Sequence, residues 1–344
     1  MAILVTGGAG YIGSHMVWAL LDAGHDVVVI DRLSTGFRWA VAPKARFYLG
    51  DVGDRLVLEQ VFAENPIDAI IHFAGSIVVP ESVSNPLDYY DNNTGNSRVL
   101  IQAAVKTGIS KLIFSSTAAV YGTPERNEPV CETATPRPEN PYGSSKLMTE
   151  IMLQDTARAH DFRYVALRYF NVAGADAQGR AGQSTRGATH LIKVACETAL
   201  GMRDGMCVYG TDYPTPDGTG MRDYIHVSDL VAAHLKALAY LQGGGSSLVA
   251  NCGYGSGSSV LDVINAVERV SGKTLNVRFE PRRPGDAAFV VADAGLARRV
   301  LGWSAVSPGL ETIVATALDW ERRRLSDEAH DIDTIRQRLA ATRF

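Results

Sequence analysis

Residues 3–13 of the chain read ILVTGGAGYIG, a short apolar run that meets closely spaced glycines at once. The run Ile3–Thr6 is typical of a strand buried on both faces of a parallel sheet. Gly7, Gly10 and Gly13 have the GxxGxxG spacing, and a helical pattern follows from Gly13 to Ala23. Glycines at such a strand-to-helix turn let the backbone approach a pyrophosphate, which the free N–H groups of the helix N-terminus bind. This stretch therefore predicts a dinucleotide-binding α/β fold.

The rest of the chain continues the alternation of strands and helices. Apolar runs predict strands at residues 27–30, 69–73, 112–114 and 164–168, and helical patterns lie at 98–106 and 146–159. This order implies a doubly wound, Rossmann-type parallel sheet. After Asn171 the chain becomes rich in glycine and proline, and helices resume at 260–270 and 310–324. We predict a cofactor domain at 1–172 with a return segment at 227–252, and a smaller C-terminal α/β substrate lobe at 173–226 and 253–344.

Composition narrows the function class. The chain has 344 residues, of which 46% are hydrophobic and 20% charged, with a net charge of −4. Such a balance is typical of a soluble globular protein, without a general attraction to nucleic acid. Four cysteines are widely spaced and form no CxxC pair, so we expect no metal site, no disulfide framework and a reduced, cytoplasmic setting. The apolar start reaches glycine too early for a signal peptide, and no run is long enough to span a membrane.

Asp31 ends the second predicted strand, about 20 residues beyond the glycine loop. A carboxylate at that place accepts hydrogen bonds from the adenosine ribose and repels a 2′-phosphate, which favours NAD over NADP. Arg32 supports the alternative, because an arginine can pair with that phosphate. Asp51 and Val52 follow another apolar stretch at 47–50, where they either contact the adenine or form a turn.

Tyr142 and Lys146 are four residues apart, a spacing that places two side chains on one helix face. An ammonium group beside a phenol favours the phenolate, so we expect Lys146 to lower the pKa of Tyr142. Such a tyrosine takes a proton from a hydroxyl near neutral pH. Ser115, Ser116 and Thr117 follow the strand at 112–114, at the edge of the sheet where ligands bind. The simpler alternatives are a solvated Tyr/Lys pair and a polar turn.

Seven segments in order along the chain resemble the extended short-chain dehydrogenase/reductase family, and within it the UDP-glucose 4-epimerases. They are residues 5–15, 72–75, 89–93, 142–146, 167–171, 212–220 and 222–227. The resemblance implies an isomerase that interconverts UDP-glucose and UDP-galactose with NAD, by transient oxidation at the sugar C4 and return of hydride to the opposite face. It also implies that Tyr142 is the base, that Thr117 shares its proton, and that Lys146 holds the nicotinamide ribose.

The resemblance further implies two sets of binding residues. The cofactor contacts are Gly7, Gly10, Tyr11, Ile12, Gly13, Asp31, Asp51, Val52, Phe73, Ala74, Asn92, Ser115, Tyr142, Lys146 and Phe170. The UDP-sugar contacts are Thr117, Tyr142, Asn171, His190, Leu191, Tyr209, Arg222, Arg283, Asp286 and Val290. Arginine offers a diphosphate a planar fork of donors. The alternatives are a local ion pair of Arg222 with Asp223, an exposed turn around Arg283 and a structural role for His190.

The chain departs from the family at several positions. Ile77 stands where many members carry a lysine near the cofactor, which weakens the expectation of tight NAD retention. Val290 stands where a bulky tyrosine restricts the sugar pocket in some members, so N-acetylated UDP-hexosamines become candidate substrates, unless Phe289 refills the space. Thr117 is followed by two alanines, and no glutamate occurs from Phe114 to Tyr121, which argues against dehydratase and decarboxylase activity.

Three further expectations concern alternatives and partners. A UDP-pentose or UDP-uronate 4-epimerase is an alternative activity, because the residues around C5 of the sugar are not identified by the motifs. A non-enzymatic NAD-binding regulator on the same fold is a second alternative. The family resemblance also suggests a homodimer formed by the helices at 98–106 and 146–159.

Overall fold

The fold is organised around a seven-stranded parallel sheet, seen in a computed structural model that describes residues 1–185, 187–283 and 285–341. The strand order is β10-β6-β5-β4-β1-β2-β3, which confirms the predicted doubly wound Rossmann-type sheet. Ligands bind such sheets where the strand order reverses, here between β1 and β4. The strands are β1 (Ala2–Thr6), β2 (Val27–Asp31), β3 (Arg46–Leu49), β4 (Ile67–His72), β5 (Lys111–Ser115), β6 (Arg163–Tyr169) and β10 (Leu248–Cys252).

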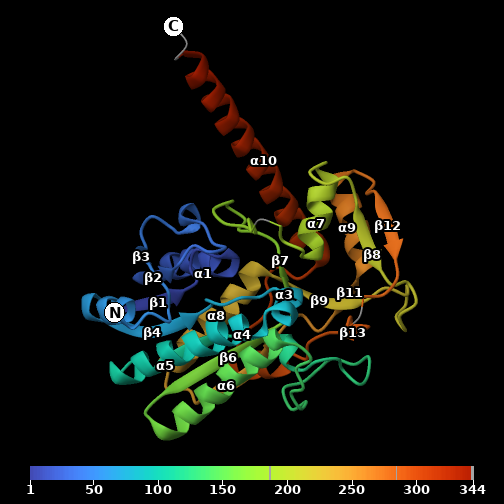
Figure 1. Ribbon diagram of the computed structural model, residues 1–344. Helices are drawn as coiled ribbons and strands as arrows, with labels where there is room; N and C mark the ends of the chain where they lie inside the picture. The colour runs from blue at the N-terminus through green and yellow to red at the C-terminus, as the bar shows by residue number, and fades with distance from the viewer. Residues whose placement is uncertain (186, 284, 342–344) are drawn as a thin grey trace.

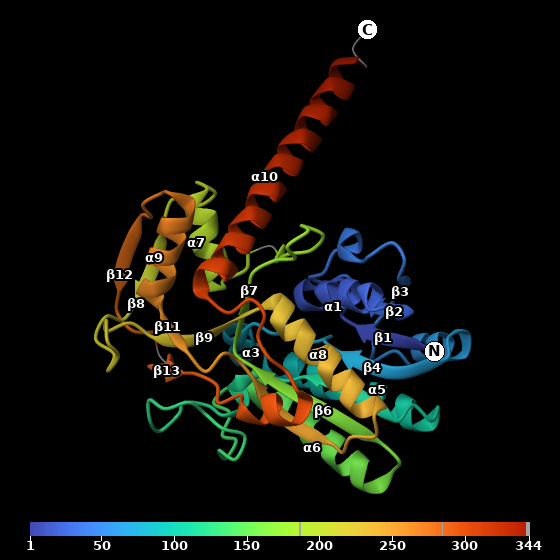
Figure 2. The ribbon, with the colours of Figure 1, turned by 180° about the vertical axis from the view of Figure 1, so that it is seen from behind.

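Helices cover both faces of this sheet. On one face, seen from behind in Figure 2, lie α1 (Tyr11–Asp22) and α8 (Val227–Gln242). On the other, in the front of Figure 1, lie α5 (Asn96–Lys106) and α6 (Pro141–Ala159), with α2 (Arg55–Glu64) packed against α5. Ile3 and Val5 belong to the core beneath α1, whereas Leu4 belongs to the core beneath α5, because side chains alternate along a strand. Because helices cover both faces of the sheet, the side chains on both faces of β1 must be apolar, and the apolar run is therefore uninterrupted.

A smaller lobe lies beside one end of the sheet and carries its own apolar core (Figure 1). One of its sheets has the order β11-β9-β13 with β7 paired to β9, and a second pairs β12 with β8. Its elements are β7 (Asn171–Ala173), α7 (Leu191–Ala199), β8 (Met206–Tyr209), β9 (Met221–His226), β11 (Gly257–Ser259), α9 (Val260–Ser271), β12 (Val277–Glu280), β13 (Phe289–Val290) and α10 (Leu310–Ala341).

Short helical elements complete the path between β4 and β5 and near the end of β5. They are α3 (Val79–Ser84), α4 (Pro86–Tyr89), a π-helical turn at Tyr90–Gly95 that leads into α5, and a 3-10 turn at Ala118–Val120. Two more lie at Arg38–Ala40 and Ala297–Leu301.

The predicted boundaries differ from the observed ones in instructive places. Helix α6 begins at Pro141, not at Lys146, because Asn140 caps it and accepts the Gly143 N–H at 2.9 Å. Tyr142 therefore lies in the first turn of the helix. The last helix continues beyond Arg324 to Ala341, and the sequence patterns did not predict the helices α2, α7 and α8. The segment at 227–252 supplies α8 and β10 to the large sheet, while the domain limits themselves remain a prediction. Among the described residues, no helix is long and apolar enough to cross a membrane.

Three buried histidines make the stability of this fold depend on pH. Burial lowers the pKa of His15 to about 4, of His72 to about 3 and of His234 to about 4. The unfolded chain binds protons below about 6.5, where the folded protein does not, so stability is complete above that pH and is lost as the pH falls toward 4. We expect the unfolding free energy, measured with urea, to drop between pH 7 and 5 by on the order of 2 kcal/mol per histidine.

Two histidine variants separate this effect from general acid sensitivity. His234→Leu should reduce the drop by about one histidine's share, whereas His160→Leu, at an exposed position, should leave the drop as it is. Equal pH dependence in His234→Leu and the parent protein would contradict the assignment.

Candidate functional site

The glycine loop is packed so closely that side chains are excluded from it. Gly7 has φ +71°, and a Cβ atom there would lie 2.7 Å from the Ala74 nitrogen. A Cβ on Gly13 would lie 2.1 Å from the Gly7 carbonyl oxygen. Gly10 precedes α1 and caps it with no side-chain hydrogen bond. The loop thus presents the backbone N–H groups of a helix N-terminus, an arrangement that fits a dinucleotide pyrophosphate.

Asp31 connects this loop to the segment that follows β2. Its Oδ2 accepts the Ala9 N–H at 2.9 Å and its Oδ1 accepts the Leu33 N–H at 2.7 Å. A carboxylate oxygen has a second lone pair, so both oxygens can still accept from a ribose hydroxyl. Arg32 lies 2.8 Å from Asp51, and this ion pair occupies the arginine that a 2′-phosphate would require. The geometry fits NAD better than NADP.

Asp51 and Val52 have structural contacts of their own. Asp51 Oδ1 accepts the Gly53 N–H at 2.8 Å and the Asn96 side-chain amide at 2.9 Å, and Val52 is buried in the core beneath α5. These contacts agree with the turn interpretation of Asp51. A contact with adenine stays a prediction.

Thr117 and Tyr142 meet at the carboxyl end of β5. Both are buried, and the Thr117 hydroxyl, which accepts the Ala119 N–H at 3.1 Å, lies near enough to the Tyr142 phenol to affect its pKa. Burial raises the pKa of Tyr142, and the Thr117 hydroxyl opposes that rise. The prediction of a lowered tyrosine pKa is therefore wrong for the protein alone, because desolvation outweighs the interactions that favour the phenolate.

Lys146 lies one helical turn beyond Tyr142, fully inside the protein. Its Nζ donates to the Ser115 carbonyl at 3.0 Å and lies 5.0 Å from the centre of the Phe114 ring. Burial lowers the pKa of Lys146 to about 8, and the negative charge of Glu150 acts against that decrease. The lysine is thus held at the end of β5, on the same helix as Tyr142.

Sequence reasoning missed a buried polar network that fixes α6 to the strand ends. Glu150, four residues after Lys146, accepts the Ser116 hydroxyl and pairs with Arg168, whose Nε donates to Oε1 at 3.0 Å. Asn93 accepts the Ser76 N–H at 2.7 Å and donates to the Ser145 hydroxyl at 3.0 Å. The spacing from Tyr142 through Lys146 to Glu150 was the available indication, since all three share one helix face.

The remaining predicted cofactor residues surround the same crevice. Phe73 and Ala74 follow β4 and touch Gly7, and the Asn92 amide donates to the Ser76 hydroxyl at 2.8 Å. The other four contact neighbouring elements. The Tyr11 hydroxyl donates to the Gly174 carbonyl at 2.6 Å, Ile12 packs on the core under α1, Ser115 is hydrogen-bonded to Tyr169, and Phe170 packs against the small cluster that contains Ala118.

The residues predicted to bind the diphosphate and sugar gather around β9. Arg222 on β9 is paired with Val290 on β13, and Asn171 on β7 is paired with Tyr224 on β9. The expected alternative, an ion pair of Arg222 with Asp223, does not form. Arg222 donates instead to the Ala287 carbonyl at 2.8 Å and the Met221 carbonyl at 2.9 Å. The buried Asp223 carboxylate accepts backbone N–H groups from Tyr254, Gly255 and Ala292.

Tyr209, Arg283 and Asp286 form a second group at the edge of the lobe. The Arg283 guanidinium lies 4.6 Å from the centre of the Tyr209 ring, and its Nε donates to Asp286 at 2.8 Å. His190 precedes α7, which Leu191 begins, and its Nδ1 lies 3.3 Å from the Gln183 amide nitrogen. Among the described contacts, His190 meets none of the other predicted site residues.

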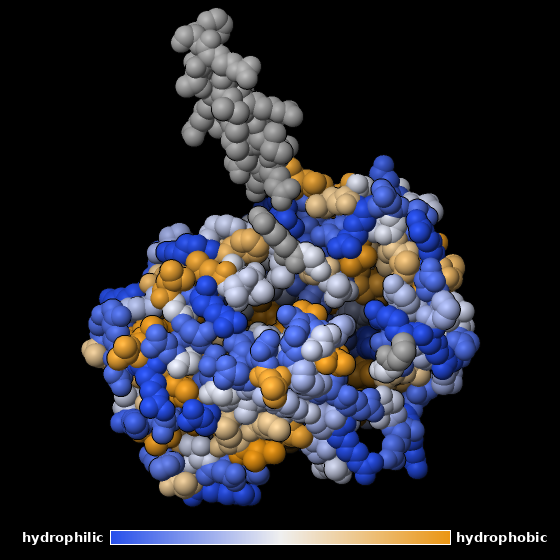
Figure 3. Space-filling model, viewed as in Figure 1, coloured by the Kyte–Doolittle hydropathy of each residue, from blue (hydrophilic) through white to orange (hydrophobic). Residues whose placement is uncertain are grey.

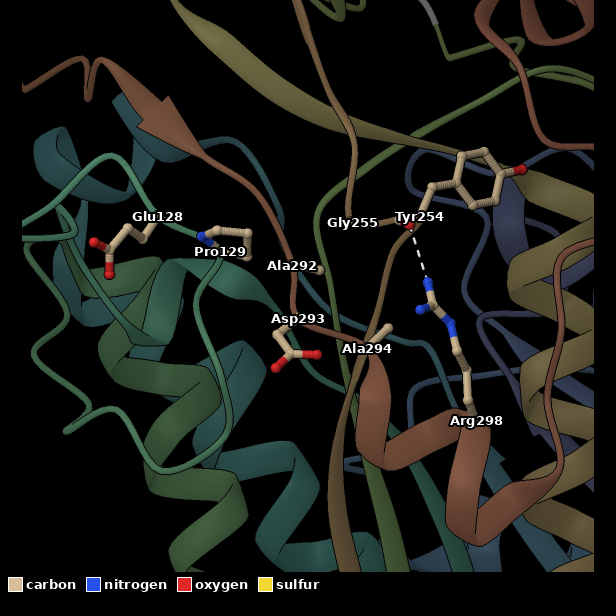
Figure 4. Close-up of a pocket in the computed structure, with 8 residues that line it drawn as sticks. All are labelled: Glu128, Pro129, Tyr254, Gly255, Ala292, Asp293, Ala294 and Arg298. Carbon is tan, nitrogen blue, oxygen red and sulfur yellow. Dashed lines mark hydrogen bonds between the residues drawn. The ribbon is translucent and has the colours of Figure 1, made fainter.

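A groove of about 520 Å³ opens beside the segment Ala292–Ala294 that follows β13. Its walls include Glu128, Asp293 and Arg298, and Arg298 donates to the Tyr254 carbonyl at 3.0 Å (Figure 4). Thr117, Tyr142 and Lys146 are not among the described residues that line it. The size of a groove alone therefore does not identify the candidate site. That site is the crevice between the large sheet and the lobe, on the face shown in Figure 3.

The chain matches known proteins over nearly all of its length. Residues 3–253 match the model of the NAD dependent epimerase/dehydratase family. The chain is 56% identical to the UDP-glucose 4-epimerase of Azospirillum brasilense over 93% of its own length and 92% of the relative's.

Two solved structures have the same fold. The UDP-glucose 4-epimerase of Bifidobacterium longum, in complex with NAD+ and UDP, has a TM-score of 0.88 at 40% identity and covers 94% of this chain and 98% of its own. The UDP-Glc/GlcNAc 4-epimerase of Campylobacter jejuni has a TM-score of 0.82 at 46% identity and covers 94% of this chain and 99% of its own.

Gly13→Ala tests the fit of the glycine loop to a dinucleotide. The new methyl group would collide with the Gly7 carbonyl and push α1 away from the loop, so we expect NAD binding, measured by calorimetry, to weaken at least about tenfold. Gly24→Ala is the control, because its φ is +82° but open space surrounds it. It should cost about 1 kcal/mol of stability and leave the affinity for NAD unchanged. Equal affinities in both variants would contradict this account of the loop.

Proposed function

Because the chain belongs to the NAD dependent epimerase/dehydratase family, we propose that it is a UDP-glucose 4-epimerase, an isomerase that interconverts UDP-glucose and UDP-galactose. The observation that carries the proposal is the buried set of Thr117, Tyr142 and Lys146 beside the glycine loop. A nucleotide-sugar hydroxyl that reaches this set meets an acid/base and a hydrogen-bond partner at once.

The protein's own groups handle the proton of the reaction. Tyr142 takes the proton of the sugar 4-hydroxyl and returns it after the ring has turned, and the Thr117 hydroxyl near the phenol orients both oxygens. Lys146 holds a positive charge close by, which favours the phenolate once the crevice is filled. Bound NAD supplies the hydride chemistry at C4, and the glycine loop with Asp31 would hold it.

The uridine diphosphate end of the substrate needs a fixed anchor, since the sugar must turn while UDP remains bound. Arg222, Arg283 and Asn171 are the candidates, on β9, on the loop before β13 and on β7. The exposed side chain of Arg283 over the Tyr209 ring leaves guanidinium donors free for a diphosphate beside an aromatic surface for a base.

Val290 supports a wider sugar pocket that also admits N-acetylated UDP-hexosamines. Val290 packs against a small apolar cluster that includes Ala118 and Val130, and Ala118 follows Thr117 in the chain. The preceding residue, Phe289, points to the opposite face of β13, because successive side chains alternate along a strand. Phe289 therefore does not refill the space that valine leaves. A UDP-pentose or UDP-uronate 4-epimerase stays an alternative, and the intact Tyr142 and Lys146 disfavour a non-catalytic NAD-binding regulator.

We also infer a cytoplasmic homodimer, with α6 at its interface. Met148 and Ile151 on α6 are 43% and 49% exposed, and Val83 and Leu87 on the adjacent α3 and α4 are 63% and 78% exposed. By contrast, Val99, Leu100 and Ile101 of α5 are buried within the protomer. A second copy that covers the apolar surface of α6, α3 and α4 accounts for that exposure.

Tyr142→Phe tests the proposed acid/base directly. Removal of the hydroxyl takes away the proton acceptor but keeps the buried ring, so we expect kcat for UDP-galactose to fall by about 100-fold or more with little change in urea unfolding. Tyr48→Phe is the matched control, since the Tyr48 hydroxyl contacts only Glu64 and Asn65 among the described residues. A Tyr142→Phe enzyme of ordinary kcat would sink the assignment.

Val290→Tyr tests the size of the sugar pocket. The larger side chain, placed against the cluster that contains Ala118 and Val130, would narrow the proposed sugar pocket, so we expect kcat/KM for UDP-N-acetylgalactosamine to fall at least about tenfold relative to UDP-galactose. Val306→Tyr, at an 81% exposed position outside the proposed dimer surface, is the control and should leave the ratio unchanged. If the parent protein does not turn over the N-acetylated substrate, the wide-pocket proposal is wrong.

A further inference from the structure

The segment after β2 crosses directly over the glycine loop. The Phe37 N–H donates to the Ala9 carbonyl at 3.0 Å. A Cβ atom on Gly36 would lie 2.6 Å from the Ala9 carbonyl carbon, so the two backbones touch without side chains between them. A small cavity beside them is bounded by Gly10 and Tyr11 of the loop, by Thr35 and Trp39 of this segment, and by Gly182 of the lobe. Segment 34–40 therefore covers the helix N-terminus at which a pyrophosphate would bind.

An aromatic stack attaches this segment to the last helix. The Phe37 and Trp39 rings are 5.3 Å apart at 27°, and the Trp39 and Trp320 rings are 6.1 Å apart at 29°. Trp39 is 57% exposed, so burial alone does not explain its position. Trp320 is 8% exposed and projects from α10. Residues almost 300 positions apart in sequence thus meet above the cofactor loop.

Trp320 also holds the lobe loop that forms the other wall of the small cavity. Its Nε1 donates to the Ser184 hydroxyl at 3.2 Å. A Cβ atom on Gly182 would lie 2.3 Å from the Trp320 ring, so the ring lies flush against the backbone of this loop. One side chain of α10 therefore fixes two separate segments on opposite sides of the same opening.

We propose that the stack of Trp39 on Trp320 is a latch that holds segment 34–40 closed over bound NAD and sets how slowly the cofactor leaves. The inference rests on the proposed function in taking NAD as the resident cofactor. Asp31 gives it a physical basis, because its carboxylate binds both the loop, at Ala9, and Leu33, the residue directly before the segment. A dinucleotide held by Asp31 leaves only when the segment that follows Asp31 moves away.

The latch also bears on Ile77, which stands where many family members carry a lysine near the cofactor. This residue is 52% exposed and has no charge to offer a cofactor. A restraint on segment 34–40 would compensate for a lysine contact that is absent there. The residues of the latch do not contact reacting atoms, so they are positioning residues whose effect is on retention.

The test measures release of the cofactor without any sugar. Protein loaded with NADH is diluted into excess NAD, and the loss of bound NADH is followed by its own fluorescence. Trp39→Ala removes the ring contact with Trp320 and should speed release roughly tenfold. Trp39→Phe keeps an aromatic ring in the stack and should release NADH within about twofold of the parent rate.

Two further variants and a folding check complete the release experiment. Phe279→Ala, at a 60% exposed aromatic of β12, should leave the release rate unchanged, and urea unfolding checks that each variant is folded. Trp320→Phe removes the hydrogen bond to Ser184 but keeps a ring, so it isolates the lobe contact. Equal release by Trp39→Ala and the parent would overturn the latch alone. A folded parent protein that binds no NADH would overturn the proposed cofactor role and the latch together.

Discussion

The close approach of α1 to the end of β1, through Gly7 and Gly13, is the constraint on which the rest of the site depends. The backbones meet at a distance that no Cβ atom can share. This contact places the N-terminus of α1 at the switch point between β1 and β4, where the strand order reverses. It also brings Ala9 within reach of Asp31, so that the loop, the end of β2 and the segment after it become one unit.

A second buried unit positions the proposed proton-transfer groups, Tyr142 and Lys146. Helix α6 is fixed to the ends of β5 and β6 by Glu150, which binds Ser116 and Arg168 in the interior. Removing one partner of such a buried pair is costly, since the other charge is then left without compensation. The network therefore keeps Tyr142 and Lys146 at the edge of the sheet, while the lobe carries the residues that we propose as substrate contacts. The glycine-loop unit and the α6 unit come from distant parts of the chain. They meet because parallel strands place their carboxyl ends at the same edge of the sheet.

The parts of the fold predicted from sequence were those with a strong local pattern. The apolar run before Gly7 predicted β1, and the spacing of Tyr142 and Lys146 predicted a shared helix face. The start of α6 was placed too late because Pro141 was not recognised as the first residue of a capped helix. The direction of the Tyr142 pKa was wrong because burial is a property of the assembled sheet. The contacts of Trp320 and Glu150 could not be predicted, since their partners lie far away in the sequence.

The most direct measurement of the account follows deuterium at C4 of the sugar. UDP-galactose labelled there is incubated with the purified protein and NAD in ordinary water, and the UDP-glucose formed is analysed for the label. The account predicts conversion to a mixture of the two sugars with deuterium kept at C4, because hydride leaves and returns within one closed site while only the hydroxyl proton passes through Tyr142. Conversion with loss of the label to water, or no conversion at all, would contradict it.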